Sequence, residues 1–492
     1  MRFKPFFGVV GFTLALFSLI VLWEGKFGLA NNGDFDRTMH PYTSGPVVTC
    51  AGENTARNFY YPIWHFNEQN QPLQSSTHVL WKLGALINRL CVSGDVLHMF
   101  VLSLIPRVCL IGCFGLLCAW VAMYPSKRRW LLYGLVLIPA GLMCSSLEYT
   151  VYLNSFYIEC GSMIFLLLFA LAAALGSGRW YMLAICALPL YGLSICKSSY
   201  VDWPLLGAGY MGLAFFLRYP AHFRPWKKGL LTWSWLLPLL ILMSTQFIKK
   251  NRDFCESENP INRFNSLYYG ALVFSHDPDS HLDRLELGGT ESAVGHSAYS
   301  SEGWRIFHAS PYRFTFSQVV SVYRHEPSSA LRGLIHVMGQ MQDLSLDYLG
   351  RTSQVTQSHS EAILTAPSFP ANAEHRMWLR PGYTCFNLWA RIKYAIFPRG
   401  GILLCALVGL TMWFGYGIVC GRKPMRALSA LGMIITLAVG CEMSIALLGD
   451  GCYELIKHLF LANLCFDLSL LVFLASMVLW RDPMNHPEDH AD

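Results

Sequence analysis

The chain has 492 residues, of which 53% are hydrophobic, 14% aromatic and only 14% charged. A soluble enzyme of this length carries more charge, so the composition excludes that class and indicates a polytopic membrane protein. The formal net charge of +6 arises mainly from basic clusters between apolar runs, and no basic stripe with interleaved aromatic residues is present, so no nucleic-acid partner is expected.

Apolar runs recur along the chain, and most are long enough to cross the ~30 Å hydrocarbon core of a bilayer. They predict about ten transmembrane helices, at Pro5–Trp23, Leu97–Met123, Trp130–Leu147, Cys160–Gly176, Tyr181–Ile195, Val201–Leu217, Leu230–Ile248, Gly401–Cys420, Ala427–Leu448 and Leu455–Trp480. No small-x-small cleavage site follows the first run, so we expect a retained helix and not a signal peptide. Basic residues gather in alternate loops, which predicts a cytoplasmic N-terminus and an even number of helices.

Three polar segments then fall on the outer side, at residues 24–95, 148–159 and 249–399. Only the last, at about 150 residues, is large enough to bury a modest core of its own. Its short apolar runs between Pro-, Gly- and Ser-bearing turns predict a small mixed α/β extracytoplasmic domain. The predicted fold is therefore an all-α polytopic membrane protein carrying this domain, with transmembrane regions at 1–248 and 400–492, the second ending in a short cytoplasmic tail.

The cysteines give no sign of a metal site. Most of the sixteen lie inside predicted spans, where Cys packs as a small apolar residue. Cys50, Cys255, Cys385 and Cys452 fall on the outer side, where any two that meet would form a disulfide in an oxidising compartment. No CxxC spacing occurs among them, so no zinc site is predicted.

Charged residues follow the first predicted helix directly, in the sequence Asn-Asn-Gly-Asp-Phe-Asp-Arg at residues 31–37. Charge is costly at the edge of a bilayer, which favours a chemical role. In an extended loop Asp34 and Asp36 point to the same side, where each is able to hold a proton or a cation. Arg37 suits a phosphate while an Asp acts as base. The alternative is a solvated loop that caps the helix.

Two further sites lie at later outer turns. Glu159 ends the sequence Tyr-Leu-Asn-Ser-Phe-Tyr-Ile-Glu, which includes Asn154, and it opens an otherwise uncharged span. A helix N-terminus favours negative charge, so simple capping is the alternative to a functional role. Nearby Glu148 is expected to be a loop acid. Lys197 is the only base in the next outer turn, where a snorkelling lysine is the alternative.

The last outer turn has the sequence Gly-Asp-Gly-Cys-Tyr-Glu-Leu-Ile-Lys-His. Asp450 between two glycines predicts a tight turn that exposes its carboxylate. Lys457 and His458 are expected in the first turns of the last span, where a cation gains nothing from the helix dipole and loses hydration. An anionic partner would resolve that conflict. Asp467 and Glu442 are weaker candidates, with partners inside the protein as the alternative.

Taken in order, these segments resemble the bacterial surface-glycan hexose transferase family, which is grouped with the polytopic GT-C-type glycosyltransferases. The resemblance rests on the NNGDFxR segment, the YxNSFxxE segment, the FNSxxYGxL run at residues 264–272 and the terminal GDGxxxxxKHL element. Elements between the last two resemble the family's D-P…L…LGL stretch and, with one inserted residue, its H-P element: Asp277-Pro278, Leu282, Leu285-Glu286-Leu287-Gly288 and His325-Glu326-Pro327.

The resemblance implies a GT-C-like fold and transfer of a hexose from a polyprenyl-phosphate donor. The reaction would take place at the outer face of the bacterial cytoplasmic (inner) membrane, with an acid of the first outer loop as base. No Gly-rich nucleotide cradle is present, which also favours a lipid donor.

Each candidate residue then has an expected role. Asp34 would take the proton of the acceptor hydroxyl, and Asp36 would assist it. The departing phosphate would be stabilised by the basic side chains of Lys457 and His458, with Arg37 or Lys197 as a third. Glu159 and Asp450 would orient the acceptor or a basic side chain, and Asn154 would contact substrate. Displacement in a single step predicts inversion at the anomeric carbon.

The expected partners are membrane lipids, the polyprenyl-phosphate-linked sugar and a glycan or lipid-linked acceptor. No cofactor or metal is predicted: Asp34 and Asp36 offer oxygen ligands that suit Mg²⁺ or Mn²⁺, but a basic phosphate site makes a divalent cation unnecessary. The outer domain carries aromatic residues that predict either an acceptor surface or the core of that domain: Trp304, Tyr312, Trp378 and Tyr383.

Two other functions fit the same residues. A lipid-linked glycan translocase or transporter would also need a polyprenyl-phosphate site, and charges distributed down the interiors of the spans would favour it. No internal repeat is found in the sequence, which weighs against a transporter. A glycan polymerase or ligase shares the lipid donor and the outward-facing site, and sequence separates it poorly from a transferase.

Overall fold

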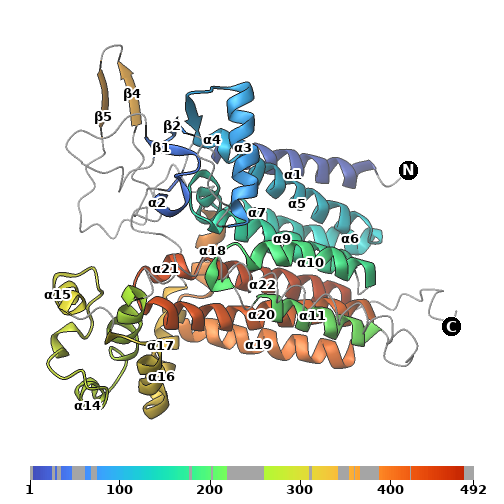
Figure 1. Cartoon of the computed structure of the whole chain (residues 1–492). Helices are drawn as coiled ribbons and strands as arrows, with labels where there is room; N and C mark the ends of the chain where they lie inside the picture. The colour runs from blue at the N-terminus through green and yellow to red at the C-terminus, as the bar shows by residue number, and fades with distance from the viewer. Residues whose placement is uncertain are drawn as a thin grey trace.

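The computed structural model describes residues 4–24, 28–29, 35–46, 61–67, 75–176, 180–200, 203–218, 260–309, 313–341, 354–358, 361–365, 387–421 and 423–480. This part of the chain is predominantly helical, with one three-stranded and one two-stranded sheet. The long helices lie side by side in a bundle, and α1 starts at the same end of the bundle at which α22 finishes (Figure 1).

Six helices of the described residues are long and apolar enough to cross a membrane. They are α1 (Lys4–Trp23), α5 (Leu104–Ala122), α9 (Glu159–Gly176), α19 (Gly400–Cys420), α20 (Lys423–Asp450) and α22 (Phe460–Trp480). The prediction of a multi-pass membrane protein is thereby supported.

A seventh candidate span is bent by 46°. Its first part comprises α6 (Ser126–Leu132), the π-helix η2 (Tyr133–Leu137) and α7 (Ile138–Cys144), and its second part comprises α8 (Leu147–Thr150) and the 3₁₀-helix η3 (Val151–Asn154). Two apolar helices are shorter, α10 (Trp180–Ser194) and α11 (Trp203–Arg218), and residues 230–248 lie outside the described residues. Six or seven spans are therefore supported, and ten stays a prediction.

The first outer loop contains more regular structure than its sequence suggests. Its elements are α2 (Phe35–Thr38), β1 (Thr43–Pro46), β2 (Ile63–Phe66) and α3 (Thr77–Cys91), followed by β3 (Val96–His98) and α4 (Met99–Leu102). The three strands form an antiparallel sheet with β2 in the centre. Because β3 and α4 take up residues 96–102, the second span begins at Leu104 and not at Leu97 as predicted. Helix α3 packs against α5 and α9 and runs across their direction (Figure 1).

The segment predicted as an outer domain, residues 249–399, is also mainly helical where it is described. Its elements are η5 (Leu267–Ala271), α14 (Pro278–Arg284), η6 (Glu291–Ala293), α15 (Ser301–Ala309), α16 (Phe316–His325), α17 (Pro327–Gln340), the hairpin strands β4 (Gln354–Ser358) and β5 (Glu361–Thr365), and α18 (Leu388–Ile396). Phe264, Tyr268 and Phe314 form the centre of a separate hydrophobic cluster. Helix α17 packs against α19 and α20, which attaches this region to the membrane helices.

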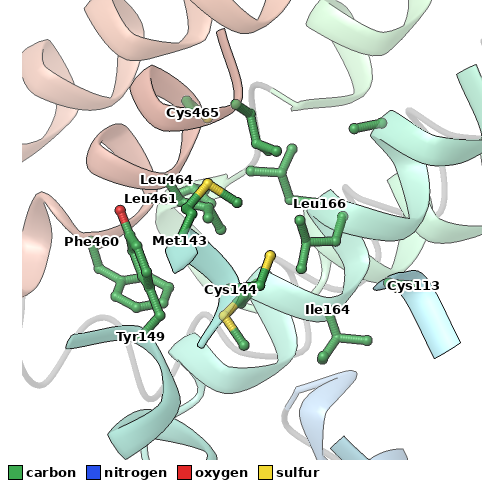
Figure 2. Packing of buried hydrophobic residues seen from close by; sticks show 14 of the residues in the cluster. Cys113, Met143, Cys144, Tyr149, Ile164, Leu166, Phe460, Leu461, Leu464 and Cys465 are labelled. Carbon is green, nitrogen blue, oxygen red and sulfur yellow. The ribbon is translucent and has the colours of Figure 1, made fainter. Parts of the chain in front are cut away.

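The core of the bundle is apolar and includes several of the predicted packing cysteines. Met143 and Cys144 of α7 face Ile164 and Leu166 of α9, with the outer part of α22 beside them (Figure 2). Deeper between α5, α7, α9, α20 and α22 lies a cavity of about 90 Å³, lined almost entirely by apolar atoms. Since no carboxylate, amine or imidazole lines it, this cavity is not where polar chemistry takes place.

Candidate functional site at one end of the bundle

The segment between η3 and α9 forms the floor of the candidate site. Tyr152, Asn154 and Tyr157 are all buried. The turn is closed by Ser155, whose hydroxyl donates to the Tyr152 carbonyl at 2.7 Å and accepts from the Tyr157 N–H at 3.1 Å. These local bonds satisfy backbone groups that would otherwise be stranded where the chain enters the bundle. Asn154 therefore lies in the site region, inside the protein and not on its surface.

The first outer loop packs directly on this floor. The Phe35 ring lies 4.8 Å from that of Tyr157 and 5.5 Å from that of Phe156, and the Thr38 hydroxyl donates to the Phe156 carbonyl at 2.6 Å. Asp34 lies outside the described residues. Asp36 and Arg37 lie on the helix α2, so the predicted extended loop is wrong from Phe35 onward.

Glu159 and Lys197 form a partly buried ion pair. Glu159 is the first residue of α9, as predicted, and its Oε1 lies 2.8 Å from Lys197 Nζ. The glutamate side chain is 3% exposed and the lysine 20%. A buried carboxylate stays charged at low cost only when a cation or helix N–H groups compensate it, and here both are present. Glu159 therefore does more than cap a helix, because it also pairs with Lys197.

Lys457 reaches the same floor from the other end of the chain. Its side chain is 5% exposed, lies 2.5 Å from Glu454 Oε2 and sits 5.9 Å from the centre of the Tyr157 ring. Lys457 and His458 belong to the four-residue helix α21 (Leu455–His458) and not to the last span, which begins at Phe460. The predicted start of that span at Leu455 is wrong because the chain turns again before α22.

Asp450 connects this turn to the segment predicted as an outer domain. It is the last residue of α20, and its carboxylate accepts a hydrogen bond from Asn265 Nδ2 at 2.7 Å and faces His458 Nε2 at 3.4 Å. The tight turn after it is confirmed by Gly451, which has a φ of +60°. The predicted exposure of Asp450 is wrong: only 9% of the residue is exposed, because Asn265 covers it.

Tyr152 marks the point where these groups meet. Its hydroxyl interacts electrostatically with Glu159, Lys457 and Glu454, which come from α9, α21 and the turn before α21. With α2 packed on Tyr157 and Lys197 paired with Glu159, four segments that are far apart in the sequence converge at one end of the bundle. The convergence brings two lysines and two glutamates to one buried aromatic floor.

Two further acids are buried in the structure: Glu24, which is not among the predicted site residues, and Glu148, which is predicted to lie in a loop. Glu24 directly follows α1 and is fully buried. Burial raises the pKa of Glu24 to about 8, to which the nearby carboxylate of Glu148 adds, while Thr150 and Arg107 act in the opposite direction. Glu148 is not a loop acid as predicted, because it lies on α8, is 2% exposed and accepts a hydrogen bond from Ser146. The sequence signal for Glu24 is its position as the first charged residue after the apolar run Pro5–Trp23.

Asp467 and Glu442 have partners inside the protein, which confirms the structural alternative for both. Asp467 Oδ1 lies 2.8 Å from Lys393 Nζ, and its Oδ2 accepts a hydrogen bond from the Tyr149 hydroxyl at 2.6 Å. Glu442 accepts a hydrogen bond from Trp203 Nε1 at 2.7 Å. Lys393 was missed because nothing in its local sequence shows that α18 inserts it into the bundle.

Glu326, in the His-Glu-Pro element, organises the start of α17. Its carboxylate accepts from the Ser275 hydroxyl at 2.6 Å, from the His276 N–H at 3.1 Å and from the Arg332 guanidinium. Burial on its own would raise the pKa of Glu326, but these hydrogen bonds outweigh it and lower the pKa to about 2. The element therefore has a structural role in the described region.

Other predicted groups are only partly covered. Within the described ranges no cluster of three or more His, Cys, Asp or Glu side chains is placed to hold a metal ion. Cys452 is a free thiol and Trp304 is 51% exposed. The remaining members of both predicted sets lie outside the described residues, namely Cys50, Cys255, Cys385, Tyr312, Trp378 and Tyr383.

Comparison with known proteins places the chain in a family. No curated protein and no solved structure matches it. One family model, described as the YfdI N-terminal transmembrane domain, matches residues 4–490, and this description names a membrane domain without naming a reaction. Since the match spans nearly the whole chain, the protein belongs to the YfdI N-terminal transmembrane domain family.

Proposed function

We propose that the chain is an inverting GT-C-type glycosyltransferase that moves a hexose from a polyprenyl-phosphate donor to a surface glycan or lipid-linked glycan. The reaction would occur at the outer face of the bacterial cytoplasmic membrane. The observation that carries the proposal is the ion pair of Lys197 with Glu159, together with the position of Glu159 and Lys457 around Tyr152 at one end of the bundle. Cations held at that depth suit the phosphate of a lipid whose tail remains in the bilayer.

The proposed chemistry is a single displacement at the anomeric carbon. The acceptor oxygen forms the new bond to that carbon as its proton passes to a carboxylate, for which Asp34 is our candidate. The bond from the carbon to the phosphate oxygen breaks, and its electron pair leaves with the polyprenyl phosphate. Lys457 and Lys197 lower the energy of the transition state by stabilising the charge that develops on that oxygen. Phe35, which packs on Tyr157, holds the neighbouring loop against the site.

Two observations favour a transferase over a translocase. A translocase needs polar groups along its path through the bilayer, yet the deeper acids Asp467 and Glu442 are hydrogen-bonded to neighbouring helices. The cavity found between the spans is apolar. The groups that suit a phosphate instead gather at the outer end, where a soluble acceptor has access.

Analysis of the surface glycan tests this function. The mass and linkage of the glycan from cells with and without the gene should differ by one hexose in a defined linkage. An unchanged glycan combined with an altered distribution of lipid-linked sugar between the leaflets would favour the translocase.

Replacement of Asp34 tests the proposed base. Asp34→Asn should abolish glycan modification while leaving the protein inserted in the membrane, because an amide cannot take up the proton. Asp95→Asn is the matched control, since Asp95 is an exposed acid of the same outer loop, and it should modify the glycan normally. Near-normal transfer by Asp34→Asn would show that another group is the base.

A further inference from the structure

We propose that Glu454 is a displaceable counter-ion, which occupies the place of the donor phosphate on Lys457 and gives way when the donor binds. This inference rests on the proposed function, because it concerns how the same site selects its lipid. Glu454 is not among the residues predicted from the sequence to act in the site.

Lys457 is buried and therefore needs an anion beside it. With 5% of its side chain exposed, an ammonium without an anion would lose most of its hydration and gain nothing in return. The carboxylate of Glu454 supplies that anion, with its Oε2 2.5 Å from Lys457 Nζ. The phosphodiester of the donor offers an ammonium charged oxygen acceptors, as a carboxylate does. A donor phosphate at Lys457 therefore competes with Glu454 for one position.

The surroundings of Glu454 also favour displacement of its carboxylate from Lys457. Its backbone is left-handed, with φ of +44° and ψ of +34°, a conformation that residues with a Cβ disfavour. Its side chain is 19% exposed, so water can take over the carboxylate once it swings away. Its carbonyl accepts hydrogen bonds from the N–H groups of Lys457 and His458, at 3.0 and 3.3 Å. These backbone bonds hold α21 in place without the side chain.

The neighbouring ion pair lacks these features. Glu159 is 3% exposed and lies in the first turn of the long helix α9, whose N-terminus stabilises its charge. Displacing it would strand a carboxylate inside the protein, whereas displacing Glu454 would return one to water. The exchange therefore belongs to Lys457, and the Tyr157 ring 5.9 Å away keeps the ammonium in position while its anion changes.

The exchange makes the site selective for charged lipids. A neutral polyprenol brings no anion, so it cannot replace Glu454 on Lys457. A polyprenyl phosphate replaces one anion with another and leaves the lysine paired throughout. Removing the carboxylate should therefore favour the phosphate lipid and leave the alcohol unaffected.

A binding measurement tests the proposal. The purified full-length chain in nanodiscs would be titrated with a polyprenyl monophosphate and, in parallel, with the polyprenol of the same length. Glu454→Gln should bind the phosphate lipid about fivefold more tightly than the unmodified protein, as expected for the loss of a competing ion pair. Binding of the polyprenol should not change.

The matched control is Glu302→Gln. Glu302 pairs with Arg305 at the same three-residue spacing, but on the exposed helix α15, and its replacement should leave the affinity for both lipids unchanged. Where Glu454→Gln fails to fold, Glu454→Gly removes the carboxylate and suits the left-handed backbone. The same tightening is expected for it.

Two outcomes would overturn the proposal, and they are distinguishable. Equal affinity of the unmodified protein and the Glu454 variants for the phosphate lipid would show that the carboxylate is not displaced, while the proposed function would stand. Failure of every form, the unmodified protein included, to prefer the phosphate lipid over the polyprenol would contradict the proposed function as well.

Discussion

Replacing Asp467 with Asn should destabilise the bundle strongly although the change in shape is small. Asp467 is completely buried and holds three groups: Lys393 at 2.8 Å, the Tyr149 hydroxyl at 2.6 Å and Trp389 Nε1 at 2.7 Å. The amide keeps one acceptor oxygen but loses the charge. Lys393, 3% exposed, then lacks its anion and keeps only the hydrogen bond to Asn463 Oδ1.

The size of the effect follows from these contacts. Breaking a buried ion pair by removing one partner costs about 3–5 kcal/mol, and a buried hydrogen-bond donor left without an acceptor costs about 1–3 kcal/mol more. A total of about 4–8 kcal/mol, divided by an unfolding entropy of about 2 cal/mol/K per residue for a chain of this length, lowers the melting temperature by about 4–8 °C.

Thermal unfolding of the purified protein in detergent, followed by loss of helical circular dichroism, measures this shift. The double variant Asp467→Asn with Lys393→Met should recover most of it, because no unpaired charge then remains in the bundle. An unchanged melting temperature for the single variant would refute the reasoning. So would a double variant less stable than the single one.

Three further predictions concern stability. Gly451→Ala should cost about 1–3 kcal/mol, because Gly451 has a positive φ and a Cβ would lie 2.6 Å from the Asn265 carbonyl oxygen; unchanged resistance to limited proteolysis would contradict this. The pKa of Glu24 is about 8 in the folded protein against 4.5 in the unfolded chain. Its contribution to stability is therefore full below pH 4.5, and the free energy of unfolding falls by up to about 5 kcal/mol as the pH rises through 8. Glu24→Gln should flatten this dependence, and a variant that loses as much stability at alkaline pH as the unmodified protein would count against it. Burial lowers the pKa of His78 from 6.5 to about 4. Its contribution to stability is therefore full above pH 6.5, and the free energy of unfolding falls by about 3 kcal/mol as the pH drops through 4. A His78→Gln variant that loses as much stability at acid pH as the unmodified protein would contradict this assignment.

Local physical rules were enough to locate much of the candidate site. A carboxylate at the start of an apolar run is tolerated at a helix N-terminus, and Glu159 does begin α9. A cation near the start of a buried helix needs an anion, and Lys457 has one in Glu454. The position of Glu159 was predictable because the cost of a charge at a helix start concerns its own segment, which one sequence contains.

Contacts between residues that are far apart in the chain could not be predicted from the sequence. Lys393 and Asp467 are 74 residues apart, and no periodicity links α18 to the middle of α22. The polar residues around Glu148 predict a turn, yet α8 and η3 form the second part of a span bent by 46°, and Glu148 is buried there. The contact of Phe35 with Tyr157 likewise depends on how the first outer loop crosses the bundle. Hydropathy specifies which segments are apolar, and it does not specify how broken helices pack.

Transfer by the purified protein tests the central claim most directly. The chain would be reconstituted in liposomes with a polyprenyl-phosphate hexose labelled in the sugar and with a glycan acceptor. We predict that the label moves to the glycan with inverted anomeric configuration, and that Lys457→Gln slows transfer by about 100-fold. Label that crosses the bilayer while still attached to the polyprenyl phosphate, at the same rate in both proteins, would contradict the account.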